Sequence, residues 1–234
     1  MSSLLARWAW MTYDNLGGLV GYNLLWSVFS LPWILSAYAL LRLGFAAGGF
    51  VFVASLVLAW VLVVGAPATA MLFVAAVAWS RGADMDCRQV LMAGRAFFWR
   101  ALILGMSLFA ASALILGNMV FYRQLDGWFG ALLSGLMVWF LLMVGLVTVF
   151  IFPVLVTQEG SAWATLRQSL LLAVDNLKYA VVFLIVAVLF AGLGLASGLG
   201  LFCGAPMAWA LFVCVGFRAL LPKYTGEALP ADVP

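Results

Sequence analysis

Charged residues are scarce in this chain, and histidine is missing from it. Only 8% of the 234 residues are charged, whereas soluble domains typically contain about a quarter. Because 68% of the residues are hydrophobic, we expect the chain to be solvated by lipid rather than by water. Without histidine, the sequence lacks the commonest metal ligand and the commonest proton shuttle. The composition therefore excludes a soluble domain and disfavours a metalloenzyme.

The spacing of the cysteines and the net charge argue against a metal site and against a nucleic-acid partner. Cys87, Cys203 and Cys214 are not spaced like the paired ligands of a metal site, so we predict no metal site and no cofactor. The formal net charge of +3 is spread thinly and forms no basic stripe typical of nucleic-acid-binding proteins. We therefore predict no nucleic-acid partner. The partner that the composition does indicate is the lipid bilayer.

Long apolar runs make up most of the chain. A membrane-spanning helix needs about 20 mostly apolar residues. Six runs qualify, at 17–41, 47–79, 98–120, 128–156, 179–197 and 201–221. We predict an all-α membrane protein in which 1–12 is an interfacial segment and 13–221 is a six-helix bundle of three hairpins. Residues 222–234 are then a short cytoplasmic tail.

The second apolar run is longer than a bilayer requires. At about 1.5 Å per residue, a helix over 47–79 exceeds the roughly 30 Å of hydrocarbon by a wide margin. Such a helix must tilt, break or project beyond the membrane. Pro67, in the stretch GAPATA, has no N–H and is the expected position of a break. A break there would expose backbone carbonyls near Thr69.

The basic residues predict the orientation of the chain. Cytoplasmic loops of membrane proteins carry an excess of lysine and arginine. Nine of the eleven basic residues fall on the same side as both ends of the chain: Arg7, Arg81, Arg88, Arg95, Arg100, Arg167, Lys178, Arg218 and Lys223. Arg42 and Arg123 fall on the other side. We therefore predict that both termini are cytoplasmic.

The first inner linker, 81–100, has the pattern of an amphipathic helix. Arg81, Arg88 and Arg95 are spaced by seven, which puts them on one helix face with Asp84. The opposite face carries Ala83, Val90 and Phe97. We predict a helix that lies on the membrane. Its arginines either face lipid phosphates or form a docking surface for a cytoplasmic partner.

The second inner linker, 161–177, has a similar pattern. Its apolar residues recur at helical spacing. They are Trp163, Leu166, Leu170, Ala173 and Leu177. We predict a second amphipathic helix, with the same two interpretations as the first: a solvated face near anionic lipid or a docking surface for a cytoplasmic partner.

The tripeptide DNL occurs twice, at 14–16 and at 175–177, each time just before an apolar run that starts on the inner side. Asp and Asn are favoured at helix N-termini, where their side chains accept hydrogen bonds from unsatisfied N–H groups. We predict that Asp14 and Asn15 cap the first spanning helix. Asp175 and Asn176 can cap the fifth in the same way.

Asn23 lies two turns inside the first apolar run and shares a helix face with Ser27 and Ser30. Polar side chains buried in a membrane protein must find partners, usually on another helix. We expect this polar face to pack against a neighbouring helix. A polar cavity is the alternative.

Several glycines predict close helix packing. Gly17, Gly18 and Gly21 thin the first helix, and Gly194 and Gly198 form a G-x-x-x-G in the fifth. Small residues at such spacing let another helix backbone approach. We expect this packing to occur within the chain rather than between two copies.

Several stretches resemble a known family. The similarity lies in five places. They are YDNLGG at 13–18, NLLW at 23–26, FSLP at 29–32, GAPATA at 65–70 and the basic linker after Arg81. In these places the chain is similar to the YesL-like family of bacterial membrane proteins. The resemblance implies a protein of the bacterial cytoplasmic (inner) membrane. It also implies an accessory role beside carbohydrate ABC-transporter components, and it carries over no catalytic residues.

The residues themselves favour a protein without a catalytic site. An ion-coupled transporter normally keeps a charged side chain inside the membrane, and none lies at clear mid-membrane depth. Asp84 and Asp86 lie among arginines in a surface linker, where charge pairing explains them. We predict a non-enzymatic accessory or assembly subunit of a membrane complex. The alternative is a carrier of a small solute or lipid, with a site near the first helix and Pro67.

Overall fold

The computed structural model describes residues 2–30, 50–125, 127–197 and 204–225, with the backbone alone at 2–3, 50–64, 195–197 and 225. All regular elements in these ranges are helices. They are α1 (Ser2–Asp14), a helix over 16–30, α3 (Phe50–Ser80), α4 (Cys87–Arg123), α5 (Trp128–Thr157), α6 (Ala162–Asp175), α7 (Leu177–Ser197), α9 (Ala205–Leu220) and α10 (Pro222–Thr225). The all-helical fold class is confirmed.

Four of the described helices are long and apolar enough to cross a membrane. They are Cys87–Arg123, Trp128–Thr157, Leu177–Gly194 and Ala205–Tyr224, with a shorter apolar helix at Gly65–Ser80. They indicate a multi-pass membrane protein. Six spans are not confirmed, because 31–41 of the first predicted run and 47–49 of the second lie outside the described residues.

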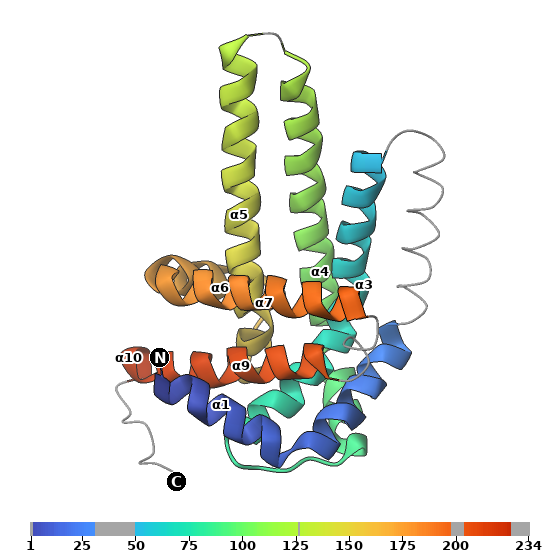
Figure 1. The fold of residues 1–234 in the computed structure, drawn as a ribbon, viewed down its shortest axis with the longest axis vertical. Coiled ribbons are helices and arrows are strands. Elements are labelled where there is room, and N and C mark those ends of the chain that lie inside the picture. The colour runs from blue at the N-terminus through green and yellow to red at the C-terminus, as the bar shows by residue number, and fades with distance from the viewer. Residues whose placement is uncertain (1, 31–49, 126, 198–203, 226–234) are drawn as a thin grey trace.

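Figure 1 shows how the candidate spans are arranged. The hairpin of α4 and α5 runs along the long axis of the molecule, with α3 beside it, while α7 and α9 run across that direction. Helix α1 lies beneath α9. At about 1.5 Å per residue, the 37 residues of α4 extend to about 55 Å, well beyond the roughly 30 Å of a hydrocarbon core. One end of α4 must therefore lie outside the membrane.

Helix α9 is the centre of the packed core. Five of its side chains are fully buried, namely Met207, Ala210, Leu211, Val213 and Cys214. Helices α1, α3, α5 and α7 all contact it. The ring of Phe183 on α7 packs edge-on against Phe212, with ring centroids 5.6 Å apart. It also fills the space over Gly216, where a Cβ atom would lie 2.2 Å from the Phe183 ring.

The break predicted at Pro67 does not occur. Helix α3 runs without interruption from Phe50 to Ser80 and has Pro67 inside it. Proline is tolerated within such helices when neighbouring helices and polar side chains stabilise the backbone that it disturbs. Here the side chain of Thr69, two residues further on, accepts a hydrogen bond from another helix. Of the three outcomes that the length of this run left open, the break is the one that the structure contradicts.

The first inner linker is not a separate helix on the membrane surface. Residues 81–82 form a turn, with Gly82 at φ +72°, residues 83–86 have no regular structure, and α4 begins at Cys87 and continues to Arg123. The N–H of Asp86 donates to Gln89 Oε1 at 2.9 Å, which fixes the start of the helix. No proline follows to end it before the apolar run. Arg81 and Asp84 therefore do not share a helix with Arg88.

The second inner linker does form a helix, α6, which begins where Ser161 Oγ accepts a hydrogen bond from the N–H of Ala164. The apolar stripe is divided, because Trp163 and Leu170 are 74% and 44% exposed whereas Ala173 is buried. The packed face consists of Thr165, Ser169 and Ala173. Small residues allow close helix contact, and the Ser169 hydroxyl donates to the Thr165 carbonyl within the same helix.

In the helix over 16–30, Gly18 is the glycine that permits a close contact. A Cβ atom there would lie 2.7 Å from Cζ2 of Trp79, whereas Gly17 and Gly21 have no described atom within 4 Å of that position. The approach is by an indole ring, not by a backbone as predicted. Gly198 of the predicted G-x-x-x-G lies outside the described residues.

We predict that Gly18→Ala lowers the thermal unfolding midpoint in detergent micelles, because the new methyl group must displace the buried Trp79 indole. Overpacking of this kind costs about 1–3 kcal/mol. Gly17→Ala is the matched control, and it should be neutral or stabilising by up to about 1 kcal/mol, because alanine favours the helix. Equal midpoints for the two variants would contradict this packing.

Candidate functional site

The polar face of the helix over 16–30 is buried, and the Ser27 hydroxyl bonds to the backbone of its own helix. Asn23, Ser27 and Ser30 are at most 3% exposed. The Ser27 hydroxyl donates to the carbonyl of Asn23 at 2.8 Å. On the same helix, Trp26 Nε1 donates to Thr69 Oγ1 of α3 at 3.3 Å. The helix over 16–30 and the Pro67 region of α3 therefore lie together, as the sequence predicted, but they meet through packing.

A second contact fastens the first helix to the turn before α4. The hydroxyl of Tyr22 donates to the carbonyl of Met85, and its ring lies 5.3 Å from that of Trp79. Sequence reasoning missed this contact. A tyrosine one turn after a glycine carries no local signal of a partner more than sixty residues away in the chain.

Asn15 and Asn176 lie at two helix junctions of the same local structure. Asn15 donates both its backbone N–H and its side-chain Nδ2–H to the carbonyl of Met11, at 3.2 and 3.0 Å. Asn176 donates the same two groups to the carbonyl of Leu172, at 3.0 and 3.2 Å. Each asparagine carbonyl then accepts from the residue four positions further on, Leu19 or Ala180.

The asparagines thus close the preceding helix rather than cap the following one with their side chains. Carbonyls in the last turn of a helix lack intrahelical partners, and an amide side chain can satisfy them. The prediction of side-chain N-caps was wrong for both asparagines. The two DNL tripeptides nevertheless lie at junctions with the same pattern of hydrogen bonds. We call these two junctions the asparagine hinges.

The C-terminal helix is held against the second hinge. Lys223 Nζ donates to Asp175 Oδ2 at 2.6 Å, and the hydroxyl of Tyr224 donates to the same oxygen. The side chain of Asn176 also contacts Tyr224. We call this set of contacts the C-terminal latch. Among the described residues, the equivalent carboxylate of the first hinge, Asp14, has no partner and is exposed.

The hydrogen bond from Lys223 holds the pKa of the Asp175 carboxyl below its usual value of 3.8, with a further contribution from Tyr224. Because the pKa is lowered in the folded protein, the latch is stabilised above that usual value and is lost as the pH falls through the lowered one. Both side chains of the ion pair are about half exposed, at 52% and 50%. Surface pairs of this kind contribute little to global stability, so the effect is local.

We predict that Asp175→Asn speeds hydrogen exchange at the Tyr224 amide at neutral pH, and that in the unmodified chain the protection factor of this amide, corrected for the slower intrinsic exchange in acid, falls as the pH drops through the lowered pKa of Asp175. Exchange mass spectrometry of the C-terminal peptide measures this. Asp14→Asn is the matched control and should leave that peptide unchanged. Equal protection in the two variants would contradict the latch.

The arginines of α4 belong to an exposed face of mixed chemistry. Arg88 and Arg95 are exposed. Met92, which lies between them in the sequence, is 63% exposed, and Trp99, one turn after Arg95, is 69% exposed. The spacing of four, three and four residues puts all four side chains on one face of the helix. The opposite face, with Val90, Gly94 and Ala101, is buried. We call the exposed face the α4 stripe.

Arg100 has a structural role that its place in the basic linker did not reveal. Its Nη2 donates to the carbonyl of Gln158 at 3.3 Å and lies 3.5 Å from Thr165 Oγ1. The guanidinium also lies 5.8 Å from the centre of the Phe97 ring. Arg100 thus joins α4 to the junction between α5 and α6.

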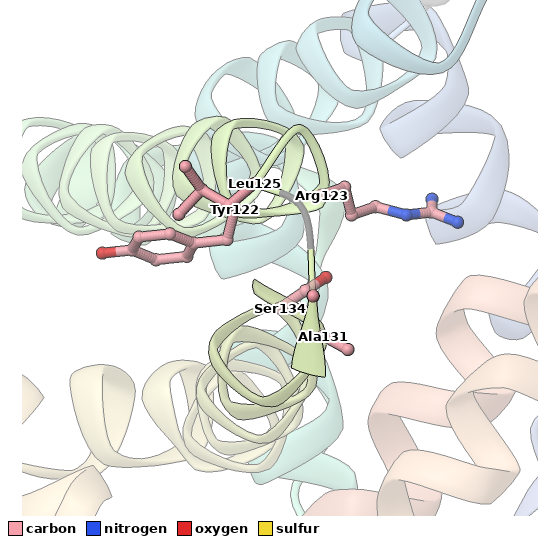
Figure 2. Close-up of a pocket in the computed structure, with 6 residues that line it drawn as sticks. Tyr122, Arg123, Leu125, Ala131 and Ser134 are labelled. Atoms are coloured by element: carbon pink, nitrogen blue, oxygen red, sulfur yellow. The ribbon is translucent and has the colours of Figure 1, made fainter. Parts of the chain in front are cut away.

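A recess at the far end of the α4–α5 hairpin has a volume of about 380 Å³. Its lining is Tyr122, Arg123, Leu125, Gly127, Ala131 and Ser134. Figure 2 shows that Tyr122 and Arg123 point away from each other. Binding sites bring a few polar groups together around one ligand, and this recess does not. No group of three or more metal-ligating side chains lies among the described residues either.

No protein-family model, curated protein or solved structure matches the chain significantly. The residues of this chain are therefore the basis for its proposed function.

Proposed function

We propose that this protein is a non-enzymatic, multi-pass membrane protein that acts as an accessory or assembly subunit of a membrane complex. The observation that carries the proposal is the α4 stripe. Arg, Met and aromatic residues are enriched in protein–protein interfaces, and Trp and Arg dominate their binding energy. The stripe presents two arginines, a methionine and a tryptophan on one rigid helix face. A partner that docks there would meet charge and apolar surface together.

The length of α4 supports a place for this surface outside the bilayer. The basic residues of the stripe lie in the first turns of a helix that is longer than the hydrocarbon core. By the distribution of basic residues, these turns and both termini lie in the cytoplasm. The resemblance to the YesL-like family would place the protein in the bacterial inner membrane. Components of a carbohydrate ABC transporter are then the proposed partner.

A carrier is the second candidate, and the buried face of Asn23 and Ser27 is the observation in its favour. Transport sites in membrane proteins are built from such polar groups near interrupted helices. The hydrogen bond from Trp26 to Thr69 instead joins this helix directly to α3, and the Ser27 hydroxyl bonds to a backbone carbonyl of its own helix. Helix α3 is also continuous through Pro67. We therefore favour the accessory subunit.

We predict that Arg95→Gln combined with Trp99→Ala lowers stoichiometric recovery of partner subunits about tenfold or more, which is the loss typical of interface hot spots. The measurement is purification of the tagged chain from its native membrane in mild detergent, followed by quantitative mass spectrometry. Arg167→Gln with Trp163→Ala is the matched control, because it removes the same two residue types from the exposed side of α6.

Equal recovery with the stripe variant and the control would contradict the docking surface. Two results together would contradict the accessory role. The purification would recover the chain without any partner, and liposomes containing only this protein would conduct a solute. These results would favour the carrier function, with its site at the buried face of Asn23.

A further inference from the structure

We propose that the groove between α1, α7 and α9 holds part of one acyl chain of an anionic phospholipid, with the lipid phosphate beside the ammonium group of Lys178. The groove has a volume of about 190 Å³. It is lined by Leu4, Leu5, Lys178, Tyr179, Val182, Phe183 and Phe212. The proposal is independent of the accessory role, because it concerns a different surface and a different kind of partner.

The groove exists because α1 is anchored at one point. Trp8 Nε1 donates to the carbonyl of Ala208 on α9 at 2.9 Å. Its ring also packs edge-on against Phe190 and Phe212, with centroid distances of 6.1 and 5.8 Å. One turn nearer the N-terminus, Leu4 and Leu5 form one wall of the groove. The opposite helices supply an aromatic floor, since Phe183 is 1% and Phe212 3% exposed.

The lining and the mouth of the groove differ in chemistry. The interior is aliphatic and aromatic, whereas Lys178 is exposed and Tyr179 is 38% exposed. Lys178 lies in the first turn of α7, where the positive end of the helix dipole opposes a cation and attracts an anion. The acid nearest to it in sequence, Asp175, is already engaged by Lys223. A phosphate at the mouth would therefore interact favourably with both the ammonium group and the helix.

Lipid has direct access to the groove. Beyond it, α7 exposes Val181, Ile185 and Val188, at 38%, 54% and 64%. By length and composition this helix is a candidate membrane span, and an exposed apolar face of this kind favours contact with acyl chains over contact with water. A free phosphate would fill only the charged mouth. A phospholipid matches the apolar interior and the cationic mouth at once.

Native mass spectrometry of the full chain, purified in mild detergent and incubated with defined lipids, tests the proposal. We expect phosphatidylglycerol to be retained about fivefold better than phosphatidylcholine, the effect of one basic residue beside an anionic headgroup. Lys178→Gln should remove this preference by lowering the retention of phosphatidylglycerol more than that of phosphatidylcholine, whose headgroup carries a compensating positive charge. Leu5→Trp, which fills the groove from a half-exposed position, should lower the retention of both lipids.

Arg167→Gln is the control, because it removes one exposed positive charge from the neighbouring helix α6. It should keep the preference for phosphatidylglycerol. An equal loss of preference in Arg167→Gln and Lys178→Gln would overturn the proposal in favour of general charge attraction. Unchanged lipid retention in Leu5→Trp, with an unchanged thermal midpoint, would overturn it as well.

Discussion

The burial of α9 is the constraint on which the rest of the described structure depends. Met207, Ala210 and Leu211 are completely buried, and four other helices pack around them. In a bilayer, apolar surface gains little by leaving lipid for protein, so tight van der Waals packing and hydrogen bonds must hold the helices together. The close fit of Phe183 over Gly216 and the hydrogen bond from Trp8 to the α9 backbone supply both.

Polar chemistry in this protein is distributed rather than gathered into one site. The asparagine hinges join α1 and α6 to the helices that follow them, and the α4 stripe faces outward from a single long helix. Among the described residues these groups do not converge on a common cavity. This distribution separates the proposed protein partner on α4 from the proposed lipid between α1 and α7.

Composition and apolar run length predicted the helical class and the positions of α5 and α7 closely, because a lipid-solvated helix needs a continuous apolar segment. The packed face of α6 was not predictable in this way. At a membrane, apolar side chains such as Trp163 can face lipid, while Thr165 and Ser169 pack inward. The direction of the Asn15 hydrogen bonds depends on the helix before it, and the contact between Asp175 and Lys223 joins residues 48 positions apart. Neither carries a local sequence signal.

Chemical labelling of Cys87 tests most directly whether the basic ends of these helices face the cytoplasm. This cysteine is exposed at the start of α4, immediately before the stripe. In a chain carrying Cys203→Ala and Cys214→Ala, we expect a membrane-impermeant maleimide to modify Cys87 in inside-out membrane vesicles but not in intact cells. Modification in intact cells would place the stripe on the outer side. That result would contradict both the orientation and the proposed cytoplasmic docking surface.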